Sequence, residues 1–201
     1  MEHRVIKAEP FQTREDGNGS RHLEGYFSVF DEPYEVLPGW IETIAQGAFT
    51  DTLRNDEDVK VLWNHNPDVV LGSTANKTAY LHQDERGLFG EAIINEEDQA
   101  AKDGYARVKR GDVRGCSFGF DILGQEESWD DDGTYRTKLT KIRLYEVSPC
   151  TFPAYQQTSV SARDKQELEK AEAKLYEKRA QKTEQWRKEM RKRLKGVDNG
   201  T

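Results

Sequence analysis

The chain has 201 residues, two cysteines and a formal net charge of -7. This length suits one domain with a hydrophobic core plus an appendage, and no apolar run is long enough to cross a bilayer. Cys116 and Cys150 stand in no CxxC or CxxxH spacing, which argues against a zinc site and against a disulfide framework. The start, MEHRVIKAEPF, lacks the basic and apolar stretches of a signal peptide, so we expect no secretion by that route.

The charge is distributed unevenly along the chain. Between Asp164 and Lys195 there are twelve Lys or Arg against seven Asp or Glu, a net of +5, whereas residues 1–163 carry -11. An acidic body with a basic extension suggests different partners for the two parts. We therefore expect a domain at residues 1–163 and a tail at residues 164–201.

Residues 1–163 consist of short strand patterns separated by turn signals. Strands are expected over 22–30, 58–64, 78–83, 87–94, 113–123 and 134–148, and helices over 47–55 and 95–111. Asn95 is expected to open the second helix and Gly111 to close it. Residues 124–136 are polar and acidic, which predicts a hairpin or a loop. Many strands with few helices favour a mainly β barrel or sandwich over a βαβ array.

The tail is predicted to be a long charged helix. Residues 164–195 contain no Gly or Pro and consist of strong helix formers. Leu168, Ala171 and Leu175 form one short apolar stripe, and Trp186, Met190 and Leu194 form another. Two interpretations stay open, a solvated and partly frayed helix or a partner-binding helix. The last residues, VDNGT, are expected to be disordered.

The segment RGCSFGF places Ser117 between two glycines in a predicted strand. Because side chains alternate along a strand, Gly115, Ser117 and Gly119 share one face, and Cys116, Phe118 and Phe120 share the other. Two interpretations fit: a serine left open to a substrate, or a structural serine at a bend or bulge. The segment also satisfies G-x-S-x-G, the nucleophile elbow of α/β-hydrolases. That match fails, because all four histidines precede Ser117, whereas the elbow's histidine follows its serine.

A serine nucleophile needs a base and an acceptor that orients the base. His65, in WNHNPDVVLG after a predicted strand, is the best candidate base, and His82 is a weaker one. Strand alternation over KIRLYEVSPC places Glu146 on one face with Ile142, Leu144 and Ser148. A buried carboxylate at that position needs a partner, and either His65 or an arginine in a structural salt bridge would serve.

Four segments together resemble the tailed-phage prohead proteases. WIETIAQGAFTDTL, VLWNHNPDVVLGST, GDVRGCSFGF and YEVSPCTFPAYQQTSV occur in that family's order, and the resemblance covers residues 20–163. The family is related in fold to the herpesvirus assembly proteases, which implies a mainly β (α+β) compact closed β-barrel with flanking helices, here followed by the charged C-terminal helix. The herpesvirus enzymes use a second histidine as third member, whereas the matching strand here carries Glu146. The resemblance therefore implies a Ser117-His65-Glu146 triad.

The resemblance also implies a function. It indicates a serine endopeptidase that cuts scaffold protein, or the scaffold segment of the major capsid protein, and often itself. It would act in the host cytoplasm inside the immature capsid, with no cofactor or metal and no requirement for nucleic acid or membrane; self-association is compatible with it. The alternative function is a catalytically inactive capsid assembly or scaffolding factor.

Overall fold

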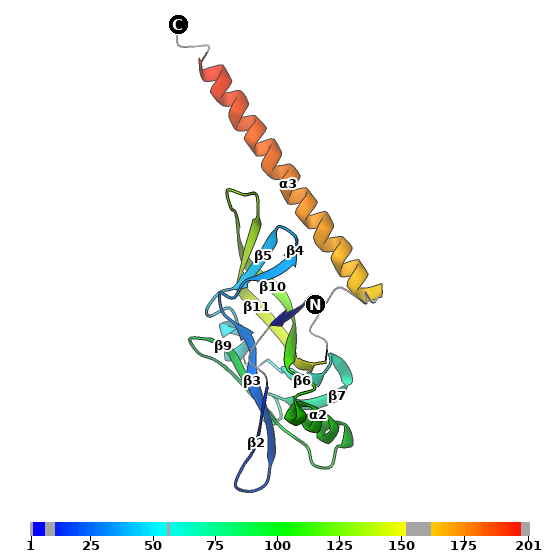
Figure 1. Ribbon diagram of the computed structural model, residues 1–201. Coiled ribbons are helices and arrows are strands. Elements are labelled where there is room, and N and C mark those ends of the chain that lie inside the picture. Colours follow the sequence, from blue (N-terminus) through cyan, green and yellow to red (C-terminus); the bar gives the residue numbers. More distant parts are fainter. Residues whose placement is uncertain (1, 7–10, 56, 152–161, 198–201) are drawn as a thin grey trace.

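The computed structural model describes residues 2–6, 11–55, 57–151 and 162–197. Within these ranges the protein is mainly β, with two sheets of seven and four strands and a helix at the C-terminal end (Figure 1). The helices of the described residues are α1 (Thr50–Arg54), α2 (Gln99–Arg110) and α3 (Ala162–Val197). None of them is long and apolar enough to span a membrane.

The larger sheet is organised around two long antiparallel neighbours, β10 (Gly115–Trp129) and β11 (Tyr135–Cys150). Its path runs through β1 (Glu2–Ile6), β10, β11, β5 (Trp40–Ile44) and β4 (Tyr34–Leu37). β11 has two parallel neighbours on its other edge, because β5 pairs with its first residues and β6 (Lys60–Trp63) with its last ones. β7 (Asn66–Ser73) completes the sheet by pairing with β6.

The smaller sheet is antiparallel throughout. Its order is β2 (Gln12–Glu15), β3 (Arg21–Val29), β9 (Gly87–Ile93) and β8 (Ala79–Gln83). The expectation of a closed barrel is wrong, because within the described residues the larger sheet ends at β1, β4 and β7 and the smaller at β2 and β8. Closure requires edge strands to pair with each other. Here β11 divides its outer edge between β5 and β6, so the larger sheet branches, and side-chain packing joins it to the smaller sheet.

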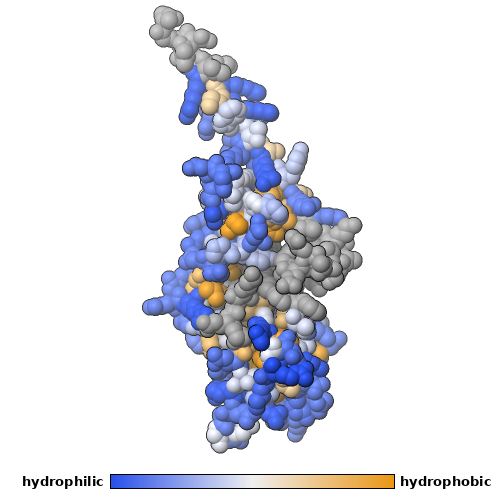
Figure 2. Space-filling model, viewed as in Figure 1, coloured by the Kyte–Doolittle hydropathy of each residue, from blue (hydrophilic) through white to orange (hydrophobic). Residues whose placement is uncertain are grey.

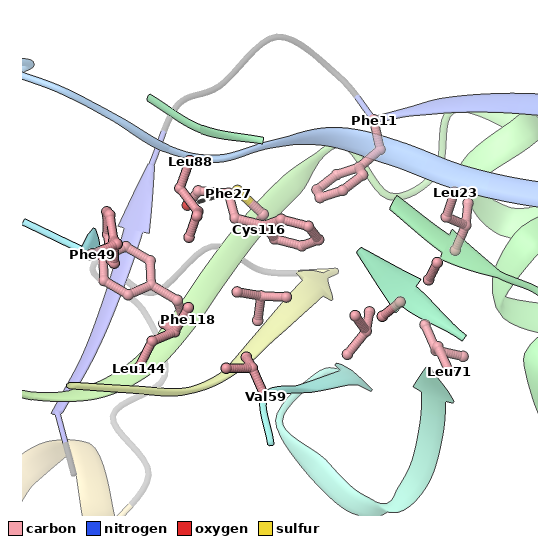
Figure 3. Close-up of a cluster of buried hydrophobic side chains, with 14 of the residues drawn as sticks. Phe11, Leu23, Phe27, Phe49, Val59, Leu71, Leu88, Cys116, Phe118 and Leu144 are labelled. Atoms are coloured by element: carbon pink, nitrogen blue, oxygen red, sulfur yellow. Dashed lines mark hydrogen bonds between the residues drawn. The ribbon is translucent and has the colours of Figure 1, made fainter. Parts of the chain in front are cut away.

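The main core fills the space between the two sheets. Figure 3 shows Phe27 of β3 and Leu88 of β9 facing Cys116 and Phe118 of β10 across this space. The shared face predicted for Cys116, Phe118 and Phe120 is confirmed, since all three are fully buried in this one cluster. Cys116 behaves as a small core residue whose Sγ donates to the carbonyl oxygen of Tyr26 at 3.3 Å.

Helix α2 differs from its prediction at one end. It begins at Gln99 and not at Asn95, because the side chain of Asp98 caps it by accepting from the backbone N–H of Ala100 at 2.8 Å. Its predicted end is confirmed, since Gly111 adopts φ +83°, a left-handed conformation that glycine reaches without steric cost.

The polar segment 124–136 forms a hairpin, one of the two expected outcomes. β10 and β11 stay paired out to Trp129 and Tyr135, with a turn between them. We call the outer halves of these strands, together with β4 and β5, the arm. The sequence pattern did not reveal β1, β2, β4, β5 or β7, which are mostly short strands.

Helix α3 packs against the arm through part of its predicted apolar stripe. Leu175 is buried there with Ala171 beside it, in a second cluster completed by Val36, Leu37, Trp40, Tyr135, Tyr34 and Trp129. Lys178 Nζ also lies 2.5 Å from Glu127 Oε2. Beyond this contact α3 runs past the arm (Figure 1), and Figure 2 shows mainly hydrophilic residues on it. Trp186 is 57% exposed. Of the segment expected to be disordered, Val197 ends α3 and residues 198–201 lie outside the described residues.

Candidate active site

Ser117 lies on the face of β10 opposite to the core residues Cys116 and Phe118. It is paired on both sides, with Val5 of β1 and with Ser148 of β11. Directly opposite residues in an antiparallel pair share a face and have Cα atoms about 4.5–5.5 Å apart. Ser117 and Ser148 are thus neighbours on one face, and both are completely buried.

A β-bulge brings Glu146 to the same face as Ser117. The β10–β11 register shifts between Gly119 and Phe120, so that Gly119 pairs with Glu146 while Phe120 pairs with Leu144. The extra residue in β11 reverses its alternation at this point. The prediction that Glu146 shares a face with Ile142 and Leu144 is therefore wrong: those two side chains lie in the core, whereas Glu146 and Ser148 lie on the Ser117 face.

The glycine opposite Glu146 contributes to this arrangement. Gly119 presents no side chain to the Ser117 face, which leaves space for the larger side chain across the ladder. The bulge beside Gly119 is one of the features that a glycine inside a strand often marks.

His65 reaches this face from the tight turn between β6 and β7. Trp63 and Asn66 pair with each other, and the two residues between them, Asn64 and His65, both adopt positive φ, 52° and 58°. This is the geometry of a type I′ hairpin turn, and asparagine and histidine are both enriched among the few non-glycine residues with positive φ. Asn64 anchors the turn: its backbone N–H donates to the carbonyl oxygen of Pro149 at 3.1 Å, and its Oδ1 accepts from the N–H of Thr151 at 2.8 Å.

The turn places the imidazole of His65 against the carboxylate of Glu146. His65 Nδ1 lies 2.6 Å from Glu146 Oε1, and the side chains are 27% and 5% exposed. A carboxylate only accepts, so Nδ1 carries the proton in this contact, and the neutral ring keeps the Nε2 lone pair for a proton. The other carboxylate oxygen, Oε2, accepts from Ser148 Oγ at 2.6 Å. The arginine that precedes Glu146 in β11, Arg143, bonds Glu57 instead.

Two of the other three histidines lie away from this contact, whereas His3 of β1 pairs with Gly119 of β10, close to Ser117 in the strand ladder. His82 is exposed in β8 with its ring against Phe89, and His22 is buried in β3 with Nδ1 2.5 Å from Glu91 Oε1. Sequence reasoning did not single out Ser148 or Asn64 for the site. The positive φ of Asn64 has a weak signal in the sequence, since Asn-rich turns between strands are often type I′. The contacts of Ser148 had no such signal. Among the described side chains there is no group of His, Cys, Asp and Glu that could hold a metal ion.

Both cysteines are poor nucleophiles in this environment. Complete burial raises the pKa of the Cys116 thiol far above its usual value. Burial, with a smaller contribution from the charge of Glu146, raises the pKa of Cys150 to about 12. At neutral pH both side chains are therefore thiols and not thiolates.

A buried carboxylate that holds a histidine, on a strand face that also carries a serine, is compatible with a serine hydrolase. The model of the caudovirus prohead serine protease family matches residues 9–173, and the chain belongs to this family. The resemblance drawn from the four sequence segments is thereby confirmed, and with it the class of serine proteases.

Two individual proteins are similar to the chain. The prohead protease of Enterobacteria phage HK97 is 29% identical over 164 residues, covering 79% of this chain and 68% of that protein. The solved structure of the bacteriophage T4 capsid assembly protease covers 75% of this chain and 99% of its own, with 11% identity and a TM-score of 0.49.

The raised thiol pKa values predict slow alkylation of the native protein. At pH 8 the thiolate fraction of Cys116 and Cys150 is very small, so iodoacetamide should modify neither appreciably, whereas both should react quickly in denaturant. Mass spectrometry of timed samples measures this. Rapid modification of the folded protein would contradict the environments described for the two thiols.

Proposed function

We propose that the protein is a serine endopeptidase in which Ser117 is the nucleophile, His65 the general base and acid, and Glu146 the carboxylate that orients His65. The observation that carries this proposal is the 2.6 Å contact between His65 Nδ1 and the buried Glu146, on the strand face that also holds Ser117. The contact favours the tautomer in which Nδ1 carries the proton and Nε2 does not, which is the tautomer that the base needs.

The proposed reaction has two halves. His65 Nε2 takes the proton of Ser117 Oγ as this oxygen attacks the scissile carbonyl, and the tetrahedral intermediate collapses to an acyl-enzyme. The leaving amine takes the proton from Nε2. Water then attacks the ester while Nε2 again accepts a proton, and the released Ser117 recovers it. Glu146 stays ionised throughout and stabilises the imidazolium formed in each half.

Substrate access requires a conformational change. Ser117 has no solvent-exposed surface, so a peptide carbonyl cannot reach Oγ in the described conformation. β1 is the strand that neighbours Ser117 on the outer side of β10. Opening of the site before cleavage would restrict proteolysis to the stage of assembly at which a substrate is presented.

The proposed substrates are scaffold protein, or the scaffold segment of the major capsid protein, and the protease itself. They are supported by membership of the prohead protease family and by the similarity to the HK97 prohead protease. The proposed place of action is the immature capsid in the host cytoplasm.

The second candidate function is an inactive capsid assembly or scaffolding factor. The complete burial of Ser117 favours it, because an inaccessible serine is also expected of a structural residue. A serine-directed fluorophosphonate separates the two functions, since a covalent adduct at Ser117 requires an activated hydroxyl. No adduct under conditions that support prohead maturation would favour the assembly factor.

The tail at residues 164–201 is proposed to recruit the protease through an acidic assembly partner, while residues 1–163 carry the chemistry. This division is supported by the net charge of +5 between Asp164 and Lys195 and by the way α3 extends past the arm (Figure 1). Contacts of this kind weaken as salt increases.

Ser117→Ala should abolish cleavage of the cognate capsid or scaffold protein, whereas Cys116→Ala should retain it. Cys116 lies in the core on the opposite face, so its loss should lower the free energy of unfolding by about 1 kcal/mol. Gel assays of cleavage and urea denaturation of both variants test this. If Ser117→Ala stayed active while a folded Cys116→Ala variant lost activity, the assignment of Ser117 as the nucleophile would be wrong.

Glu146→Gln should reduce turnover by orders of magnitude in a protein that still folds, because an amide can hold the wrong imidazole tautomer and cannot balance the imidazolium. In a Ser117→Ala background it should cost little further activity, because triad members act as a unit. Peptide turnover and melting temperature are measured on the single and double variants. A less stable protein with an unchanged rate per folded molecule would assign Glu146 a purely structural role.

Reversing three exposed charges on the outer part of α3, by Lys188→Glu, Arg191→Glu and Lys192→Glu, should leave hydrolysis of a short peptide unchanged and reduce incorporation into proheads. The matched control is Lys188→Arg with Lys192→Arg, which keeps the charge. Incorporation is measured by sedimentation of assembled particles at two salt concentrations. Equal incorporation of both variants would exclude charge-based recruitment by α3.

A further inference from the structure

Ser148 contacts both His65 and Glu146. Its Oγ donates to Glu146 Oε2 at 2.6 Å and accepts from the backbone N–H of His65 at 3.2 Å. It is completely buried, and it lies directly opposite Ser117 in the β10–β11 ladder. A hydroxyl has one proton and two lone pairs, and here the proton and one lone pair are both engaged by proposed site residues.

The two hydrogen bonds of Ser148 control different parts of the site. The bond to Oε2 fixes the rotation of the Glu146 carboxylate, so that Oε1 is left for the imidazole. The bond from the His65 N–H holds the main chain from which the ring projects. Because the donor faces an ionised oxygen, the bond to Oε2 is of the stronger, charge-assisted type.

The turn that carries His65 needs such support. Two successive non-glycine residues with positive φ, Asn64 and His65, are uncommon and are held by their surroundings. Pro149 and Thr151 hold Asn64, while Ser148 holds His65 itself. All three supports come from the end of β11, which also carries Glu146, and from the residue that follows it, so the base and its carboxylate are aligned by one segment of chain.

We propose that Ser148 is a positioning residue that aligns the imidazole of His65 with the carboxylate of Glu146. The proposal rests on the function proposed above and assigns to this hydroxyl no contact with the substrate. Ser148 bonds the carboxylate of Glu146 and the main chain of His65, and neither bond involves Nε2, the atom proposed to activate the nucleophile. Both of its hydrogen bonds go to the proposed base and its carboxylate, which is the geometry of a residue that aligns them.

The protein contains a matched control for the loss of a buried hydroxyl. Ser73, at the far end of β7 from the His65 turn, is also buried, and its Oγ donates to Asp58 Oδ1 at 2.6 Å and accepts from Lys60 Nζ at 3.2 Å. Ser73→Ala thus removes the same kind of bond to a carboxylate without touching His65 or Glu146. A loss specific to Ser148→Ala is therefore a loss of alignment and not of general stability.

The first measurement is kinetic and uses the full chain. Ser148→Ala should lower kcat by about a hundredfold with KM unchanged, because misalignment of a reacting group by about 1 Å has an effect of this size and substrate contacts are retained. Ser73→Ala should keep the wild-type kcat per folded molecule. If both variants keep the wild-type kcat, Ser148 does not position the base. If Ser148→Ala loses fluorophosphonate labelling while Ser117→Ala retains it, Ser148 is the nucleophile and the proposal is overturned.

The second measurement does not depend on activity. In Ser117→Ala protein, proton NMR should show a low-field signal from the Nδ1–H of His65 bonded to Glu146. Adding Ser148→Ala should abolish this signal, and adding Ser73→Ala should leave it. If Ser148→Ala does not fold, Ser148→Cys fills the space with a weak donor and should weaken the signal. If the signal is unchanged when Ser148 is replaced, Ser148 does not position His65. If the Ser117→Ala protein still cleaves its substrate, the proposed function is wrong, and this result leaves the positioning role of Ser148 to the NMR measurement.

Discussion

The antiparallel ladder between β10 and β11 is the interaction on which the remaining structure depends. The ladder continues from Gly115 and Cys150 at the site to Trp129 and Tyr135 at the arm. The two parallel neighbours of β11, β5 and β6, pair with it at different points along its length. One face of its inner half contributes Cys116, Phe118 and Val147 to the core. The opposite face carries the candidate site, so the residues that stabilise the fold and those proposed for chemistry alternate along the same strands.

The bulge at Gly119 and Phe120 allows one strand pair to carry both the apolar core residues and the charged carboxylate of the site. Without it, regular alternation would place Glu146 beside Leu144 in the apolar core, where an ionised carboxylate is costly to desolvate. The extra residue reverses the alternation, and Glu146 meets His65 and Ser148 while Leu144 stays in the core. A buried charge is thereby surrounded by donors, which is the condition under which it is tolerated. Bulges are common beside active sites because they redirect a side chain in this way.

The arm and α3 form a second centre of packing, separate from the site. Trp40, Tyr135 and Leu175 are buried there together, with Lys174 over the Trp40 ring and Lys182 over the ring of Trp129. The apolar stem of a lysine packs against an aromatic ring, and its ammonium group is attracted to the ring face, so both parts of the side chain can stabilise the contact between α3 and the arm. The inner part of α3 is thus attached to the acidic body, while its outer part presents basic residues to the surroundings. This separation fits a helix that serves both as a brace for the arm and as a contact for a partner.

Local sequence determined the elements with strong patterns and the residues with distinctive chemistry. β3, β9 and β10 follow from alternating apolar residues, the end of α2 follows from Gly111, and the four family segments identify Ser117, His65 and Glu146 as candidates. Short strands such as β4 and β5 left too weak a pattern, because β5 pairs with residues of β11 that lie 95 positions later in the chain and β4 joins the sheet only through β5.

Only the tertiary structure decided how the site is assembled and whether the sheet closes. The contacts of Glu146 depend on a bulge, which arises from how two strands pair and leaves no mark in either strand alone. The position of His65 depends on a turn held by the end of β11, more than eighty residues later in the sequence. The open, branched sheet depends on β11 sharing its edge between β5 and β6. Each of these outcomes is a relation between distant segments, and such relations become definite only when packing brings the segments together.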